Sequence, residues 1–150
     1  MKVLTSILLL WTSVTMFSQS DTLVGEYFHT AGDREEHLIQ YTLTLNENGT
    51  FLFHSYVNHN RGISWEENKY GKGNWSLDGK IVSFFTHEQN DLDEKHTLDF
   101  SNSKARFITK PLRDKTDRII KTRLQFFESE IFWIERLKIL KNKNALQQRL

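Results

Sequence analysis

The chain has no cysteine, so it can form no disulfide and offers no thiolate nucleophile. Its stability must therefore come from packing alone. A lipid anchor attached to a cysteine at the end of an export signal is excluded for the same reason. Proline is almost as scarce, since Pro111 is the single proline of the 150 residues.

Long apolar runs are missing after the first residues. The opening stretch, MKVLTSILLLWTSVTMFSQS, places Lys2 before an apolar run from Val3 to Val14 and a polar boundary at Phe17 to Gln19. This order is typical of an export signal, and the run is shorter than the roughly 20 residues that span a bilayer. We predict that residues 1–20 are a cleaved signal peptide, with a membrane anchor as the alternative. The mature chain is then periplasmic or secreted, with no stable membrane span.

Net charge is also nearly absent, but the two halves differ. Residues 21–100 hold 14 acidic and 6 Lys or Arg side chains, whereas residues 101–150 hold 5 acidic and 13 Lys or Arg side chains. The basic residues alternate with Ile, Leu, Phe and Trp, which a disordered nucleic-acid arm would lack. We therefore expect no nucleic-acid binding. The split instead predicts that the first strand, Leu23 to His29, lies beside the last, near Ile131 to Leu140.

Motifs for catalysis and metal binding are absent. The chain contains no Gly-x-Ser-x-Gly elbow and no His-Glu-x-x-His pair. Its six histidines show no tight ligand spacing, and Lys95 interrupts the calcium-like spacing of Asp91 and Asp93. We predict no catalytic residue, metal site or cofactor from these patterns, and a solvated loop at EQNDLDEKH.

The pattern that is present is a succession of short strands separated by turns. In HLIQYTLTL, Tyr41, Leu43 and Leu45 share one face, and the following NENG is a turn sequence. On the return strand Phe51 and Phe53 face the core, which leaves His54 and Tyr56 on the wet face. Asp78-Gly79 predicts a second hairpin turn.

Two further hairpins are predicted in the second half. KHTLDFSNSKARFIT would turn at Asn102-Ser103, and IIKTRLQFFESEIFWIERLKIL would turn near Glu128-Ser129. The second turn would place four apolar side chains on one face, namely Leu124, Phe126, Ile131 and Trp133.

These segments predict an all-β fold, an antiparallel up-and-down meander of about eight or nine strands. The meander would form a single β-barrel domain over residues 21–140, followed by a flexible tail at 141–150. A β-sandwich is the alternative.

The order of LVGEYF, YTLTLNENGTFLF and GKGNWSLDGKIVSFF resembles that of small exported bacterial lipocalin-like proteins. The resemblance covers residues 23–140. It implies an up-and-down barrel with an internal or mouth-located cavity for a small molecule.

Aromatic side chains provide the candidate site, because the chain holds 11 Phe, 4 Trp and 4 Tyr. Small barrels are filled by such side chains or enclose a ligand between them. The candidate ligand-binding residues are Tyr41, Phe51, Phe53, Trp75, Phe84, Phe126 and Trp133.

Three functions stay open at this stage. The first is binding of a small apolar or amphipathic ligand. The second is a packed β-domain that binds a protein or envelope component, with TKPLRDKTDR as a candidate docking loop for phosphate, glycan or protein. The third is a hydrolase or isomerase that uses a His-carboxylate pair, although the sequence favours a binding protein over an enzyme.

Overall fold

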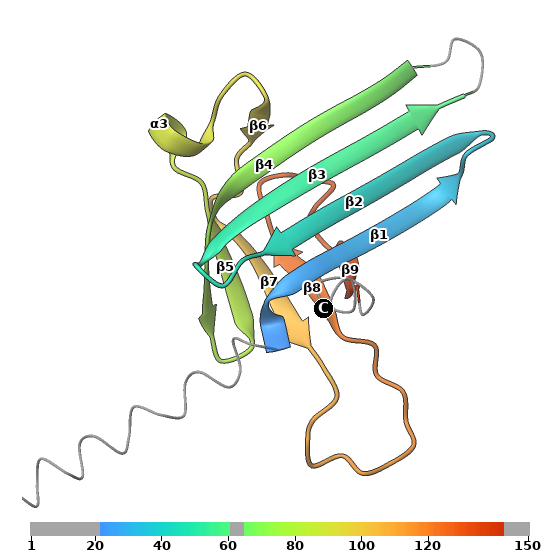
Figure 1. Ribbon diagram of the computed structural model, residues 1–150, viewed down its shortest axis with the longest axis vertical. Helices are drawn as coiled ribbons and strands as arrows, with labels where there is room; N and C mark the ends of the chain where they lie inside the picture. The colour runs from blue at the N-terminus through green and yellow to red at the C-terminus, as the bar shows by residue number, and fades with distance from the viewer. Residues whose placement is uncertain (1–21, 61–64, 143–150) are drawn as a thin grey trace, which may run out of the picture.

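The computed structural model describes residues 22–60 and 65–142, and within them nine strands form one sheet. The strands pair in the order β3-β2-β1-β9-β8-β7-β5-β4-β6, and β3 also pairs with β4, so eight strands close into a barrel (Figure 1). The predicted antiparallel, lipocalin-like barrel is confirmed, and the sheet is not a β-sandwich. The elements are β1 (Gly25–Asp33), β2 (His37–Leu45), β3 (Thr50–His59), β4 (Trp65–Asp78), β5 (Ile81–Phe85), α3 (Glu88–Asp91), β6 (His96–Leu98), β7 (Ser103–Ile108), β8 (Arg123–Glu128) and β9 (Lys138–Lys141).

The first two predicted hairpins form as expected. Between β2 and β3 the Asn46 N–H donates to the Thr50 carbonyl, and Gly49 adopts a φ of 80°, a value that glycine reaches without steric cost. The strands pair from Leu45 opposite Phe51 onward. Asp78 and Ile81 flank the second turn, which joins β4 to β5.

Closure joins the first strand to the last, as the charge split predicted. Tyr27 lies opposite Lys141, and Phe28 lies opposite Leu140. Among the described residues, however, no ion pair connects β1 with β9. Lys141 instead donates to the Thr22 carbonyl and lies 5.9 Å from the Tyr27 ring centroid, and its burial lowers its pKa. Backbone pairing and packing therefore seal the barrel.

The hairpin predicted around Asn102-Ser103 is wrong. A turn does occur there, with Asn102 at a φ of 61°, but β6 pairs with β4 in parallel rather than with β7. The edge of β7 is already taken by β5, where Val82 lies opposite Ala105. The preceding segment therefore leaves the barrel wall, and β6 attaches to the outer edge of β4.

The tight turn predicted at Glu128-Ser129 is also wrong. β8 ends at Glu128, yet β9 begins only at Lys138, so Ile131 and Trp133 lie in a loop and not on a strand. The loop is folded, because Ile134 donates its N–H to the Ile131 carbonyl at 2.9 Å. Ile134 and Leu137 are buried in the core, which explains why the chain makes this excursion before returning as β9.

A cluster of buried apolar side chains fills the barrel. Phe100, from the β6–β7 connection, lies 5.2 Å from Phe51, 5.0 Å from Phe53 and 6.1 Å from Phe84 between ring centroids. Leu23 and Tyr27 are fully buried near the start of β1, and the Tyr27 hydroxyl donates to the Leu23 carbonyl. That burial raises the pKa of Tyr27 above its usual value.

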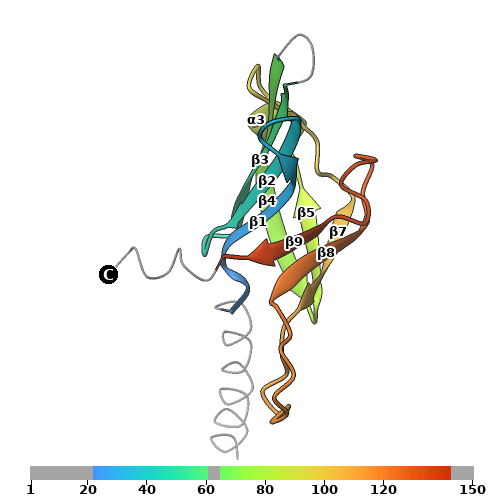
Figure 2. The same cartoon turned by 90° about the vertical axis from the view of Figure 1, so that its right-hand side faces the viewer.

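Strands β1 to β4 continue past the rest of the barrel (Figures 1 and 2). β9 pairs with β1 only at Tyr27 and Phe28, while β1 and β2 stay paired as far as Asp33 and His37. We call this part the four-stranded extension, residues 29–33, 37–41, 55–59 and 65–69. At the opposite end of the molecule, residues 109–122 form the long β7–β8 loop.

The described residues include only part of the terminal segments predicted from the sequence. The predicted signal peptide, residues 1–20, and residues 143–150 lie outside the described residues. Of the predicted tail, Lys141 still belongs to β9, and Asn142 donates its N–H to the Glu26 carbonyl. Within the described part of the chain, no helix has the length and apolar character needed to cross a bilayer.

Candidate functional site

The predicted ligand-binding residues divide into two groups. Phe51, Phe53, Phe84 and Phe126 are at most 2% exposed and pack in the core cluster. The Phe84 ring contacts those of Phe51 and Phe126, with centroids 5.2 and 5.3 Å away, and the Phe53 ring contacts that of Phe100. That these four line a ligand cavity stays a prediction, and in the structure each of them packs against other core rings.

The other three candidates lie at the margins of the core. Trp75 donates its indole N–H to the Asn46 carbonyl at 3.1 Å, beside the β2–β3 turn. Tyr41 stacks on Trp133 at 5.3 Å and on His29 at 5.9 Å, so these rings meet where the four-stranded extension begins. All three candidates are partly buried against the core.

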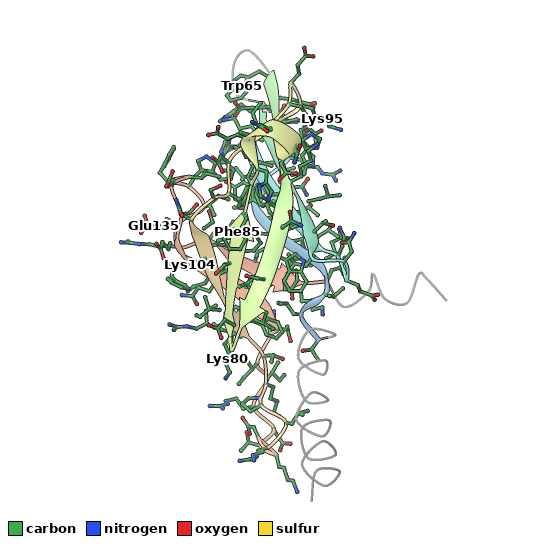
Figure 3. The ribbon with its side chains drawn as sticks, turned by 90° about the vertical axis from the view of Figure 1, so that its left-hand side faces the viewer. Trp65, Lys80, Phe85, Lys95, Lys104 and Glu135 are labelled. Carbon is green, nitrogen blue, oxygen red and sulfur yellow. The ribbon has the colours of Figure 1, made fainter. Side chains whose placement is uncertain are left out.

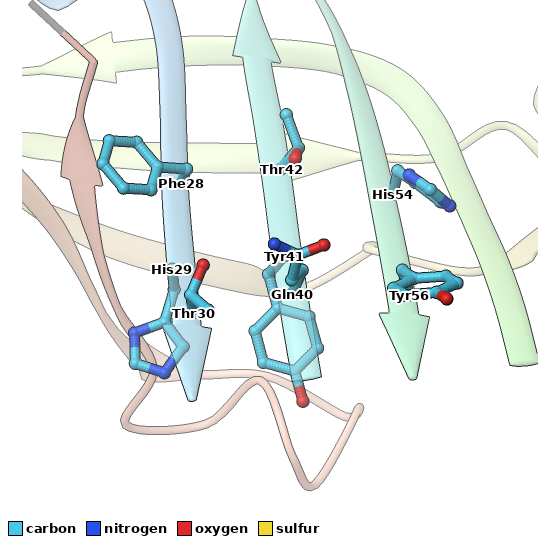
Figure 4. A pocket seen from close by; sticks show the side chains of 8 residues that line it. All are labelled: Phe28, His29, Thr30, Gln40, Tyr41, Thr42, His54 and Tyr56. Carbon is cyan, nitrogen blue, oxygen red and sulfur yellow. The ribbon is translucent and has the colours of Figure 1, made fainter. Parts of the chain in front are cut away.

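A first pocket lies on β1, β2 and β3, with a volume of about 380 Å³ (Figure 4). Thr30, Gln40 and Thr42 are short polar side chains on these strands, and Phe28 and His54 stand to either side of them. Tyr56, His29 and Tyr41 complete the lining. The pocket combines hydroxyl and amide groups with aromatic walls, and no lysine or arginine lines it.

A second, larger pocket lies where the β7–β8 loop meets β8, β9 and β1. Its volume is about 810 Å³, and four of its residues are basic while four are aliphatic. We call it the basic groove, and its residues are His29, Ile108, Arg118, Ile119, Ile120, Lys121, Arg123, Lys138 and Leu140.

Three cations of the basic groove have no ion-pair partner among the described residues. Lys121, Arg123 and Lys138 take part in none of the ion pairs that join described side chains. The Arg123 Nε is buried and has no hydrogen-bond acceptor within those residues. A buried donor without a partner costs free energy.

The fourth cation of the groove belongs to a locally ordered part of the loop. Arg118 donates to the Asp114 carboxylate at 2.8 Å. Hydrogen bonds from the Thr116 side chain and backbone, followed by that from Arg118, lower the pKa of Asp114. Asp114 therefore orders this part of the loop through its hydrogen bonds, while Arg118 and Lys121 of the loop line the groove.

The stretch EQNDLDEKH, predicted to be a solvated loop, contains α3 and an exposed ion-pair cluster. Hydrogen bonds from the His96 backbone and the Lys72 side chain hold the pKa of Asp93 well below its usual range. His96 Nδ1 lies 2.9 Å from Asp93 Oδ1, which is the geometry required by the His-carboxylate hypothesis. This pair lines neither of the two pockets described above. Its contacts fasten the α3–β6 segment onto β4.

His54 and Tyr56 lie on the outer face of β3, opposite in direction to the buried Phe51 and Phe53. His54 stacks on Tyr70 with centroids 4.5 Å apart and bonds Asn68 at 2.8 Å. Tyr56 donates its hydroxyl to Glu66 at 3.0 Å. The polar face of the hairpin is thus covered by side-chain contacts from β4.

Sequence reasoning identified only part of the basic groove. The loop TKPLRDKTDR was recognised as a candidate anion site, and the pair Ile119-Ile120 directly follows it. Lys138 and Leu140 were missed because they come from β9, and only the β8–β9 pairing of Arg123 with Leu140 brings them to the loop. No family model, curated protein or solved structure matches this chain.

Proposed function

We propose that this chain is an exported, lipocalin-like barrel protein that binds a small amphipathic anion. The ligand would lie in the basic groove, on the outside of a barrel whose interior is filled by its own aromatic side chains. The main support is that one groove holds both aliphatic side chains and three cations without an ion-pair partner among the described residues, Lys121, Arg123 and Lys138. The sequence predicted an apolar or amphipathic ligand among the aromatic side chains of the barrel. We propose an amphipathic ligand in the basic groove instead.

The apolar part of the groove favours a ligand with a hydrocarbon portion. Ile119 is 87% exposed, so its apolar surface is open to a ligand in the groove. Ile108 of β7 and Leu140 of β9 are half-buried on either side of Arg123 of β8, so they supply a firmer surface beneath the loop. A chain of several methylene groups would remove this apolar area from water, at about 25 cal/mol for each Å².

The cations favour a carboxylate or a phosphate as the polar end of the ligand. Hydrogen bonds between ionised partners are stronger than neutral ones, and an arginine can hold two oxygens of one anion. The Arg123 Nε is already desolvated, whereas Lys121 and Lys138 are exposed and can move to meet the anion. The volume of about 810 Å³ is in the range of pockets that hold small organic ligands.

Charge reversal in the basic groove is the test. The double variant Lys121→Glu/Lys138→Glu should bind the fluorescent amphiphile dansyl-undecanoate at least about tenfold more weakly, equivalent to about 1.4 kcal/mol. The matched control Arg34→Glu/Lys95→Glu makes the same change in net charge away from the groove and should bind as the parent does. Fluorescence titration at constant ionic strength measures both.

Two further measurements test the apolar part and the anionic part of the ligand one at a time. Ile119→Ser should weaken dansyl-undecanoate binding with no loss of fold stability, because the side chain is 87% exposed. The methyl ester of the probe should bind poorly, because it lacks the anion. Equal weakening by both double variants would mean that net charge alone attracts the probe, and unchanged binding in the groove variants would exclude this site.

Export is a separate prediction. The apolar run after Lys2 should be removed, so the mature chain should begin between Gln19 and Asp21. N-terminal sequencing of protein recovered from the periplasm or medium measures the cleavage site. Retention of Met1 in a membrane fraction would support the anchor alternative instead.

A further inference from the structure

Two histidines face each other across the end of the four-stranded extension. His37 is the first residue of β2 and His59 is the last residue of β3, and they are direct partners in the antiparallel register. Asn60 donates its N–H to the Glu36 carbonyl at 3.1 Å, the bond that flanks this pair on the outside. The two histidines therefore occupy a non-hydrogen-bonded position, where facing side chains approach most closely.

The side chains of His37 and His59 are in direct contact. His37 Nδ1 and His59 Nδ1 lie 2.7 Å apart, and the two ring centroids are separated by 4.0 Å. Two neutral imidazoles at this distance share one proton, with one nitrogen donating and the other accepting. The same approach also directs two nitrogen ligands at a common point, from two strands whose pairing fixes their positions.

We propose that His37 and His59 form a binding site for a divalent transition-metal ion. Neutral imidazole is a good ligand for Cu²⁺, Ni²⁺ and Zn²⁺, and Cu²⁺ binds most tightly to a given nitrogen site. The ion would take the place of the Nδ1 proton, which would move to Nε2 of the same ring so that both imidazoles stay neutral, and the two nitrogens would separate by a few tenths of an ångström. Side-chain rotation is sufficient for that movement.

Water would complete the coordination of the metal ion. No group of three or more His, Asp or Glu side chains converges within residues 22–60 and 65–142, so the protein supplies two ligands here. The affinity should be lower than that of structural sites with three or four protein ligands. Open positions on the ion would remain available to an external ligand.

Trp65 provides an optical reporter of this site. It is the first residue of β4, directly opposite His59, and its ring lies 4.1 Å from the His59 ring. Figure 3 shows Trp65 at the end of the four-stranded extension. Because bound Cu²⁺ quenches a neighbouring indole, occupancy should reduce the emission of Trp65 more than that of the more distant Trp75.

Titration of the full-length protein with Cu²⁺ tests the proposal, using tryptophan emission and calorimetry in a buffer that does not bind metals. The parent should show saturable quenching, and His37→Ala and His59→Ala should each raise the dissociation constant at least about tenfold. His87→Ala, which removes an exposed histidine at the start of α3, should leave binding unchanged. Trp65→Phe should retain the calorimetric signal and lose most of the quenching.

Two results would contradict a metal site at His37 and His59. If His37→Ala and His59→Ala bind Cu²⁺ as tightly as the parent, the histidines form only a hydrogen-bonded pair and the proposal is wrong. The same conclusion follows if His87→Ala weakens binding as much as they do. Circular dichroism of each variant establishes that the strands are intact, so loss of binding cannot be confused with unfolding.

Discussion

Phe100→Ala is expected to lower the free energy of unfolding by about 3–5 kcal/mol, the range for a fully buried phenylalanine. Phe100 is 0% exposed and its ring contacts those of Phe51, Phe53 and Phe84. Truncation would leave a cavity beside the aromatic side chains of β3 and β5, the two strands that pair with β4, where rigid rings cannot collapse. Urea denaturation followed by circular dichroism measures the change.

Phe132→Ala is the control for this substitution. Phe132 lies in the loop between β8 and β9 and is 84% exposed, so its truncation should change stability by less than about 0.5 kcal/mol. A loss below about 1 kcal/mol for Phe100→Ala would mean that the barrel interior is loosely occupied. In that case an internal ligand cavity would again be the better hypothesis.

Gly73→Ala should be at least as damaging, with a loss of about 3 kcal/mol or more because the clash involves backbone. A Cβ at position 73 would lie 2.0 Å from the Phe85 carbonyl oxygen and 3.0 Å from a ring carbon of Phe51. Neither atom can retreat easily, since Asn74 pairs with Phe85 in the ladder and Phe51 is in the core. Thermal or urea unfolding of the variant gives the value.

Gly79→Ala separates this clash from backbone strain. Gly79 adopts a φ of 60°, but a Cβ there would have no neighbouring atom within 4 Å. Its replacement should cost about 1–2 kcal/mol, the penalty of a left-handed conformation alone. If Gly73→Ala proved no more harmful than Gly79→Ala, the packing of β4 against β5 and β3 would be looser than described.

Local patterns predicted much of this fold because strands and tight turns leave local signals. Alternation of Tyr41, Leu43 and Leu45 identified the inner face of β2, and these residues do pack in or against the core. The NENG turn fixed the register of the next strand. The opposite charges of the two halves led to the correct neighbours for β1, although packing rather than ion pairing holds them together.

The errors in the second half have a common cause. HTL does form a strand and IFWIE has the Ile, Phe and Trp typical of one, but nothing local shows whether a partner edge is free. The edge of β7 was occupied by β5, which sent β6 to β4. Ile134 and Leu137 were needed to cap the core, which turned a predicted strand into a loop.

The positions of the candidate sites depend on strand register even more than the fold does. The basic loop was visible in the sequence, whereas Lys138 and Leu140 reach it only through the pairing of β9 with β8 and β1. His37 and His59 are separated by 22 positions, and only the full β2–β3 register makes them partners. Residue types predicted the chemistry available to this chain, and long-range pairing decided where that chemistry gathers.

We propose that the barrel is filled and that an amphipathic anion binds in the basic groove. Methyl NMR of isoleucine-, leucine- and valine-labelled protein during titration with decanoate tests it most directly, because each methyl reports its own surroundings. Binding in the groove should give saturable shifts at the groove residues Ile108, Ile119, Ile120 and Leu140, and none at the core residues Leu43 and Val82. Saturable shifts at Leu43 and Val82 with an unchanged groove would contradict it and place the ligand inside the barrel.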